Sequence, residues 1–416
     1  MIMQDNEKKP ALRFKGFTDP WEQRKLGEIA KEVVRNDPAS DAPIMMITAG
    51  NGFIEQSDRY AFNNAGESLK KYILLECGEL AYNHGASKLR PYGSCFALTT
   101  VEKARIPFVY HCFSVEKSNP EFLSIELNGA NVENQLRKIV SSGARMDGLL
   151  NIAYSEYTEV TVQLPKKEEQ DWIAKFFKHL DTLITLHQRK YERLVNIKKS
   201  MLDKMFPQNG ASVPEIRFKG FTDPWEQRKL GDAFERVVRK NTNNESRLPL
   251  TISAQDGLVD QITYFNNRVA SRDVSNYYLV YNGEFAYNKS TSDGYPFGAV
   301  KRLDWYEKGV LSTLYIVFAL KHPEKDDSDF MTVFYDTDRW HRGVAERAAE
   351  GARNHGLLNI SADDFFDIDT TMPEDKVEQE KIGRLLKKLD TLITLHQRKL
   401  EKLQNIKKSC LEKMFV

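Results

Sequence analysis

The chain has 416 residues, a length sufficient for more than one domain. Of these residues 41% are hydrophobic and 29% charged, a balance typical of soluble globular proteins. A formal net charge of +1 excludes a polycation, so binding to nucleic acid would depend on local basic patches. No apolar run reaches the length of a membrane span and the first residues resemble no signal peptide, so we expect a cytoplasmic protein. The four cysteines form no C-x-x-C pair, which favours reduced thiols over a zinc site.

An internal repeat organises the chain. The segment RFKGFTDPWEQRKLG occurs unchanged at residues 13–27 and 217–231, and LDTLITLHQRK occurs at 180–190 and 389–399. The sequences between these identical frames have diverged strongly. This pattern predicts two copies of one fold that occupy equivalent places and perform different versions of one task.

The two diverged bodies, residues 28–165 and 232–373, combine short apolar runs with Gly, Asn and Pro turns. This mixture predicts a mixed α/β or α+β domain in each copy. Shorter helices are expected around residues 120–139 and 328–349.

A long amphipathic segment follows each body. After Pro165, apolar residues recur every three or four positions until Pro207 ends the pattern, and a matching segment begins after Pro373. Each segment predicts a helix of about 40 residues, or roughly 60 Å. The matching apolar seams favour an intramolecular antiparallel coiled coil. The alternative is two independent amphipathic helices, each packed on its own domain.

This arrangement resembles the specificity subunits of type I restriction–modification systems. The segments LPKKEEQDWIAKFFKHLDTLI (164–184) and MPEDKVEQEKIGRLLKKLDTLI (372–393) are similar to the proline, Glu-Gln and Leu-Asp signature that ends a target recognition domain in that family. GARMDGLLNI (143–152) and GARNHGLLNI (351–360) resemble the glycine-led stretch before it. The likeness covers residues 10–416.

The resemblance implies a pseudo-two-fold symmetric, non-catalytic DNA-recognition subunit whose fold is α+β or mixed α/β. Its expected parts are target recognition domain 1 (10–165), a central long helix (166–206), a linker (207–216), target recognition domain 2 (217–373) and a C-terminal long helix (374–416). Each domain would read one half of a bipartite, gapped site in double-stranded DNA. The helices would set the spacing and dock two methyltransferase subunits.

The resemblance also implies restriction subunits, acting as endonuclease and translocase, as further partners. We expect no cofactor on this chain, and S-adenosylmethionine, ATP and Mg on the partner subunits. The sequence has no Pro-Pro pair, no F-x-G-x-G loop and no G-x-x-x-x-G-K-[ST] loop, which argues against a catalytic site of its own. Two alternatives stay open, a coiled-coil adaptor that binds no DNA and a self-sufficient methyltransferase or nuclease.

Candidate DNA contacts fall in two kinds of segment, chosen because Arg, Lys, Asn and Gln read bases while cations and hydroxyls bind phosphates. The first kind is a polar loop after an apolar strand, and its candidates are Asn83, His84, Ser87, Lys88, Arg90, Tyr92, Asn288, Lys289, Ser290, Tyr295, Lys301 and Arg302. The second kind precedes each long helix, and its candidates are Arg137, Lys138, Arg145, Arg342, Arg353 and Asn354. Solvated turns and a charged helix face are the alternative interpretations.

Overall fold

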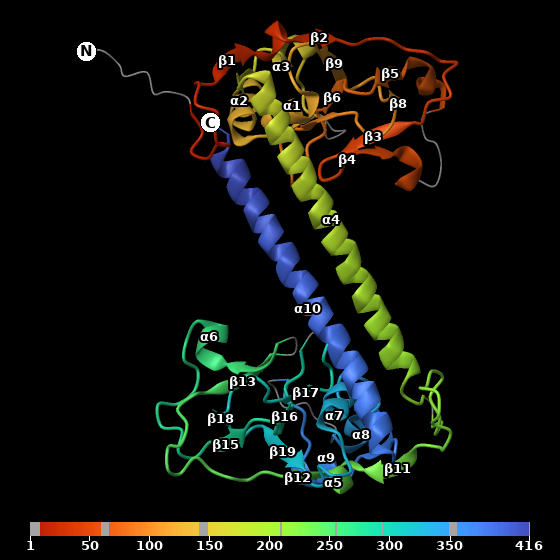
Figure 1. Ribbon diagram of the computed structural model, residues 1–416, viewed down its shortest axis with the longest axis vertical. Coiled ribbons are helices and arrows are strands. Elements are labelled where there is room, and N and C mark those ends of the chain that lie inside the picture. Colours follow the sequence, from red (N-terminus) through yellow and green to blue (C-terminus); the bar gives the residue numbers. More distant parts are fainter. Residues whose placement is uncertain are drawn as a thin grey trace, which may run out of the picture. The chain divides into compact units, whose positions relative to one another are not determined.

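The structure, a computed structural model, describes residues 9–59, 66–140, 149–208, 210–253, 256–292, 294–348 and 356–415. The chain divides into two units (Figure 1): the first is Met1–His187 with Lys399–Val416, and the second is Gln188–Arg398. Each unit therefore combines one diverged body with a part of each long helix.

In the first unit, the repeated frame and the body that follows it form short strands and helices. Its strands are β1 (Glu22–Lys25), β2 (Ala30–Glu32), β3 (Met45–Thr48), β4 (Gly52–Glu55), β5 (Ile73–Glu76), β6 (Leu80–Asn83), β7 (Ser94–Ala97), β8 (Lys103–Ile106), β9 (His111–Val115) and β10 (Thr161–Leu164). Its helices are α1 (Pro120–Leu127), α2 (Ala130–Ile139) and α3 (Tyr154–Tyr157), with 3₁₀ turns η1 (Leu26–Glu28), η2 (Gln56–Asp58) and η3 (Gly66–Lys71).

The frame and the body of the second unit repeat this strand order. Its strands are β11 (Glu226–Lys229), β12 (Phe234–Arg236), β13 (Leu250–Ser253), β14 (Gly257–Asp260), β15 (Tyr278–Tyr281), β16 (Phe285–Asn288), β17 (Ala299–Arg302), β18 (Lys308–Leu311), β19 (Ile316–Leu320) and β20 (Asp369–Met372). Its helices are α5 (Leu230–Ala233), α6 (Gln261–Phe265), α7 (Ser328–Phe334), α8 (His341–Arg347) and α9 (Ala362–Phe366).

Strand pairing is the same in both units. A four-stranded antiparallel sheet has the order β2-β9-β6-β7 in the first unit and β12-β19-β16-β17 in the second. The strand in each repeated frame pairs with the last strand of the body that follows it, as β1 with β10 and β11 with β20. The expected mixed fold with a tandem repeat is therefore confirmed.

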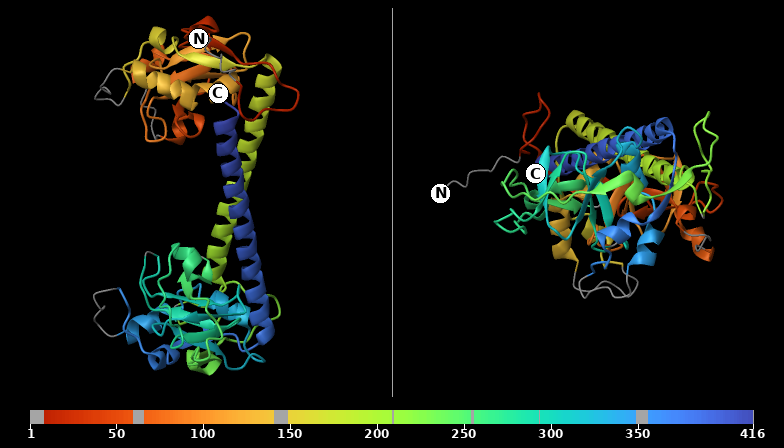
Figure 2. Two further views of the ribbon diagram at one scale, coloured as in Figure 1. Left: turned by 90° about the vertical axis from the view of Figure 1, so that its left-hand side faces the viewer. Right: turned by 90° about the horizontal axis from the view of Figure 1, so that it is seen from below.

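The two long helices are α4 (Lys167–Lys204) and α10 (Lys376–Lys413), each 38 residues long. In the first unit, the start of α4 and the end of α10 contribute to one apolar core, for example through Phe177 and Met414. In the second unit the roles are exchanged, and Met201 of α4 packs with the core that contains Leu386 of α10. The helices therefore pair antiparallel within each unit, as Figure 2 also shows.

The identical frame at the start of each body is attached to a long helix by a buried ion pair. The Arg13 guanidinium donates two hydrogen bonds to the Glu169 carboxylate, at 2.8 and 2.6 Å. Arg217 binds Glu378 in the same way at 2.7 and 2.8 Å, and both carboxylates are almost fully buried. A bidentate pair fixes orientation as well as distance, so each frame is held on its long helix in one orientation.

The Glu-Gln signature also has a structural role in both units. The Gln170 side chain donates to the Pro165 carbonyl at 2.9 Å and accepts from the Asn119 backbone N–H at 2.8 Å. Gln379 makes the equivalent bonds to Pro373 and Asp327, also at 2.9 and 2.8 Å. One buried glutamine thus joins the start of each long helix to the residue that caps α1 or α7.

The shorter helices differ from the expectation in one respect. Each expected helix is divided in two, α1 and α2 in the first unit and α7 and α8 in the second. Asn128 forms the C-cap of α1, and α2 begins after Gly129. The interruption therefore gives the backbone groups at the end of α1 hydrogen-bond partners before the next helix begins. Periodicity alone does not locate such a break, because a helix cap need not change the spacing of the apolar residues.

We predict an unusual pH dependence of stability from Glu126 of α1. This carboxyl is 2% exposed, and burial raises its pKa from 4.5 to about 7. The folded state holds the proton more tightly than the unfolded chain, so this stabilisation is complete below about pH 4.5 and is lost as the pH rises through about 7. Glu126→Gln should remove that loss, which is on the order of 3 kcal/mol.

Urea unfolding of the two proteins at several pH values measures this difference. The unfolding free energy of Glu126→Gln relative to the original chain should increase from acidic to neutral pH. A difference that stays constant over this range would show that the pKa of Glu126 is the same in the folded and unfolded states.

Candidate nucleic-acid interface

Two loops leave the four-stranded sheets at equivalent places. The first loop, residues 84–93, connects β6 to β7, and the second loop, residues 289–298, connects β16 to β17. The strands before them carry the similar sequences LAYN and FAYN. The matching sheets therefore present two different sequences at one structural position.

A buried tyrosine and a glycine close each loop. The Tyr82 hydroxyl donates to the Tyr92 carbonyl at 2.6 Å, and Tyr287 donates to Phe297 at 2.8 Å. At the end of the first loop Gly93 has a φ of +82°, and a Cβ there would lie 2.6 Å from the Asn83 carbonyl oxygen. The same restriction holds at the end of the second loop, so glycine is required at both positions.

The loops contact the segments that precede the long helices. The Leu150 N–H donates to the His84 carbonyl at 2.9 Å, and the Leu358 N–H donates to the Lys289 carbonyl at 3.0 Å. In the second unit, Thr291 also donates through its N–H and its hydroxyl to the Gly356 carbonyl. The structure thereby brings together two polar segments that lie far apart in the sequence.

Helix α2 or α8 contributes one further side chain beside each loop. The Arg137 guanidinium lies over the Tyr92 ring, 5.6 Å from its centroid. In the second unit, the His341 ring is 5.0 Å from the Phe297 ring. A planar nitrogen-containing group next to an aromatic ring suits stacking on nucleic-acid bases or contact with the backbone.

The structure leaves some candidates open to solvent. The exposed ones are Ser87, Lys88, Arg137, Lys138, Ser290 and Arg342. The Arg342 side chain is 89% exposed, and its ion-pair partner Glu346 lies one turn away on the same helix. These side chains have the freedom that contact with a phosphate backbone requires.

Other candidates are held by the protein itself. The Arg302 guanidinium binds Asp304, Ser328 and Asp329, and these carboxylates raise its pKa against the effect of burial. Arg90 donates to the Asn128 carbonyl at 2.7 Å. These contacts favour a structural role for both arginines over contact with DNA.

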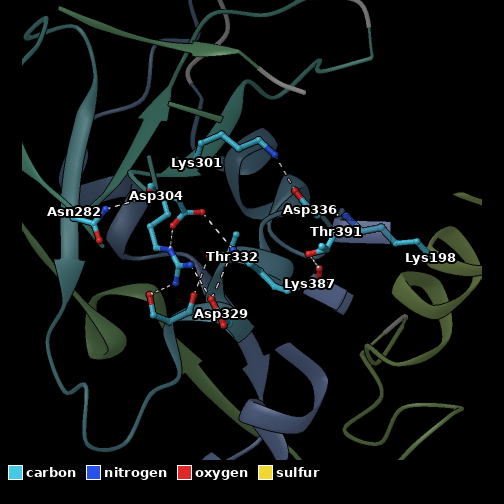
Figure 3. Close-up of polar contacts among 11 residues, drawn as sticks. Lys198, Asn282, Lys301, Asp304, Asp329, Thr332, Asp336, Lys387 and Thr391 are labelled. Carbon is cyan, nitrogen blue, oxygen red and sulfur yellow. Dashed lines mark hydrogen bonds and ion pairs between the residues drawn. The ribbon is translucent and has the colours of Figure 1, made fainter. Parts of the chain in front are cut away.

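Lys301 belongs to an ion network that the sequence did not indicate (Figure 3). Its ammonium lies 2.9 Å from Asp336, and Lys198 of α4 binds both Asp336 and Asp390 at 2.9 and 2.6 Å. Burial raises the pKa of Asp336, but Lys301 and Lys198 outweigh this and hold it below its usual value. The network ties α4 to β17, to the turn after α7 and to α10. Its members come from segments too distant for sequence spacing to reveal.

The remaining candidates either bond to residues close to them in the sequence or lie outside the described residues. Asn83 and Asn288 accept the backbone N–H two residues further on, at 2.9 and 3.1 Å, and so shape the first turn of each loop. Tyr295 closes a turn with Ser292. Arg145, Arg353 and Asn354 lie outside the described residues. Contact of any of these candidates with DNA stays a prediction.

The described ranges contain no group of three or more His, Cys, Asp or Glu residues placed to hold a metal ion. In the same part of the chain, no helix has the length and apolarity of a membrane span.

Comparison with solved structures identifies the fold. The chain is similar to the crystal structure of the type I restriction–modification system S subunit from M. genitalium, with a TM-score of 0.58 and 14% sequence identity over 98% of this chain and 99% of that one. This likeness shows that the chain has the fold of a type I restriction–modification S subunit. No protein-family model and no curated protein matches the sequence.

Two further structures align over most of the chain. One describes complex assembly and conformational transition of the type I R-M system, with a TM-score of 0.42, 13% identity and coverage of 97% of this chain and 99% of that one. The other is the HsdS subunit from Thermoanaerobacter tengcongensis, with a TM-score of 0.41, 14% identity and coverage of 95% and 96%.

The requirement for glycine at the end of the first loop is testable with Gly93→Ala. Gly78 is the matched control, because its φ is +90° but no atom lies within 4 Å of a Cβ placed there. Gly78→Ala should cost about 1 kcal/mol from backbone strain alone. Gly93→Ala should cost about 1–3 kcal/mol more, because its Cβ also clashes. Equal losses in thermal unfolding would contradict the close approach.

Proposed function

We propose that this chain is the non-catalytic DNA-specificity subunit of a type I restriction–modification complex, and that each unit reads one half of a bipartite site. The observation that carries the proposal is a pair of diverged polar loops at equivalent positions of two matching sheets, in units that share identical frames. The S-subunit fold agrees with it. An adaptor would need the frames but not this divergence at the loops.

Phosphate contact would come from the exposed cations beside the first loop. Replacing Lys88, Arg137 and Lys138 by Gln removes three positive charges, and each lost phosphate contact lowers the slope of log affinity against log salt by about 1. Binding to random-sequence duplex DNA across a salt series measures the slope. Replacing the exposed Lys31 of β2 by Gln is the control and should leave the slope unchanged. An unaltered slope in the triple variant would remove these cations from the interface.

Division of the target between the units predicts a one-sided change of specificity. Residues 30–163 can be replaced by the corresponding residues of another protein with the S-subunit fold. The exchanged chain, assembled with its methyltransferase partner, should methylate sites altered in one half only. Mapping of methylated bases in genomic DNA gives the result, and a change in both halves would contradict separate reading.

We also propose that the long helices set the spacing of the half-sites and dock two methyltransferase subunits. Each helix is unbroken over its 38 residues, and each contributes to the core of both units. S-adenosylmethionine, ATP and Mg would be bound by methyltransferase and restriction partners, in keeping with the absence of their usual sequence motifs here.

Spacing by the helices is testable by adding one heptad after Lys190 and one after Lys399. Seven residues add about 10 Å to each helix while keeping the apolar seams in register. At about 3.4 Å per base pair, the preferred spacer should grow by about three base pairs. Overall activity should fall, because these pairs rotate the second half-site by roughly 100°.

A library of sites with different spacers, methylated by the extended chain, measures the preference. A single insertion in one helix is the control, and it should impair folding because the helix ends no longer match. An active, doubly extended chain that keeps the original spacer would show that the helices do not set the distance.

A further inference from the structure

The repeated frames contain one arginine that has different partners in the two units. Arg24 of β1 and Arg228 of β11 occupy the same place in the identical sequence EQRK. Arg228 donates two hydrogen bonds to the Asp326 carboxylate, at 2.8 and 3.1 Å, and Asp326 is only 1% exposed. The second unit therefore closes this position with a buried, bidentate ion pair made by its own residues.

A serine stands in the place of this aspartate in the first unit. Asn119 caps α1 and Asp327 caps α7, and each accepts a hydrogen bond from the backbone N–H three residues further on. Ser118 and Asp326 directly precede these two caps, so they occupy the same structural position. Because a hydroxyl has no charge, the first unit lacks the carboxylate that its arginine would meet there.

Arg24 and Ser118 consequently differ from their counterparts in their contacts. The Nε of Arg24 lies 3.0 Å from Glu28 and 3.9 Å from Glu22, and both carboxylates are exposed. Exposed ion pairs contribute little stability, so another anion can displace them readily. Ser118 is buried, and within the described ranges no group makes a hydrogen bond to its hydroxyl. A buried hydroxyl in this state favours binding of an external polar group.

An open cleft connects these two side chains. It has a volume of about 450 Å³, and its lining includes Arg24, Ser118 and, from the first turn of α4, Lys167 and Gln170. Four basic and three acidic side chains line it, which gives a net charge of +1. The cleft thus offers a guanidinium with several N–H donors, a hydroxyl and a small excess of positive charge, a combination that suits a carboxylate.

The cleft lies away from the loop assigned to base reading. Ser118 lies before the first turn of α1, whereas the first loop contacts the other end of this helix, where Arg90 donates to the Asn128 carbonyl. The 8 residues of α1 separate these places by about 12 Å. The start of α4, by contrast, belongs to the cleft, and α4 is one of the helices proposed to dock a methyltransferase subunit. This position favours a protein partner over DNA.

We propose that this cleft binds an aspartate or glutamate side chain of the methyltransferase subunit that docks on the first unit. The inference rests on the proposed function for the identity of the partner, and on Arg24 and Ser118 for the chemistry. The partner's carboxylate accepts from Arg24 the two hydrogen bonds that Asp326 accepts from Arg228, and it accepts a further one from the Ser118 hydroxyl. In the second unit Asp326 already occupies this place, so the two methyltransferase copies are held by different contacts.

The chemistry of the cleft is testable in the full chain alone by supplying the carboxylate at position 118. Ser118→Asp reproduces the pair of the second unit and should raise the midpoint of thermal unfolding by about 2–4 °C. The same substitution in a chain with Arg24→Gln is the control, because it keeps a negative charge before α1 but removes the guanidinium. The rise should be lost there. Equal changes with and without Arg24 would show that this arginine takes no carboxylate at position 118, and would overturn the proposal.

The partner is testable by calorimetric titration of the full chain with the methyltransferase subunit of the same system. Arg24→Gln and Ser118→Asp should each weaken one of the two binding steps about tenfold, because the first removes the guanidinium and the second occupies it. The matched control is Arg35→Gln, which removes an exposed arginine of the same unit. Arg35 lies outside the cleft, where it pairs with Glu79 at 2.8 Å, so its loss should leave both steps unchanged.

The outcomes separate this inference from the proposed function. Unchanged affinity in both cleft variants would show that no carboxylate of the partner enters the cleft. Weaker binding of random-sequence duplex DNA by Arg24→Gln, with unchanged affinity for the methyltransferase, would assign the cleft to a phosphate and overturn the proposal. If the original chain bound no methyltransferase, the proposed docking would fail and the partner with it. The unfolding measurements would still decide whether Arg24 accepts a carboxylate.

Discussion

The apolar core of each unit is complete only when it includes the end of a long helix that begins in the other unit. Phe206, just beyond α4, lies 5.8 Å from Trp225 and 5.6 Å from Phe330, measured between ring centroids. Phe415, just beyond α10, lies 6.0 Å from Trp21 and 5.8 Å from Phe122. Because these rings enter the two main aromatic cores, neither body has a complete core without the helix that arrives from elsewhere in the chain.

This constraint explains which residues are repeated without change. The tryptophan of the repeated frame contacts the incoming phenylalanine, and the arginine of that frame forms the buried pair with the glutamate of a long helix. A change in any one of these positions would leave a cavity or an unpaired buried charge, each costly by several kcal/mol. In the loops between the strands, only the closing tyrosine and glycine are under a comparable packing constraint. Divergence is therefore possible where the proposed reading takes place.

The sequence predicted the features that repeat or follow a period. Two long amphipathic segments and two diverged bodies were enough to expect the fold, because periodicity and internal identity are visible in one sequence. The break between α1 and α2 was missed, since it depends on a cap at Asn128 rather than on a change of pattern. The expected domain boundaries stay predictions. In the structure, each unit contains a part of both long helices.

The candidate site was predictable in its location but not in its details. Polar loops after apolar strands were expected, and loops do follow β6 and β16, while their contact with DNA stays a prediction. Sequence composition selected residues by type. The sequence could not show that Arg302 and Lys301 form ion pairs with Asp329 and Asp336, because these partners lie 27 and 35 residues away. Nor could it show that the ring of His84 is enclosed by two carbonyl oxygens. Three-dimensional contacts decide which polar side chains are free to bind a ligand.

The central claim is that two units of one chain read two separate pieces of DNA. Selection of bound duplexes from a random pool by the purified full chain, assembled with its methyltransferase partner, tests it most directly. The account predicts enrichment of two short conserved segments separated by a spacer of fixed length and variable sequence. Enrichment of a single continuous sequence, or of none, would contradict it.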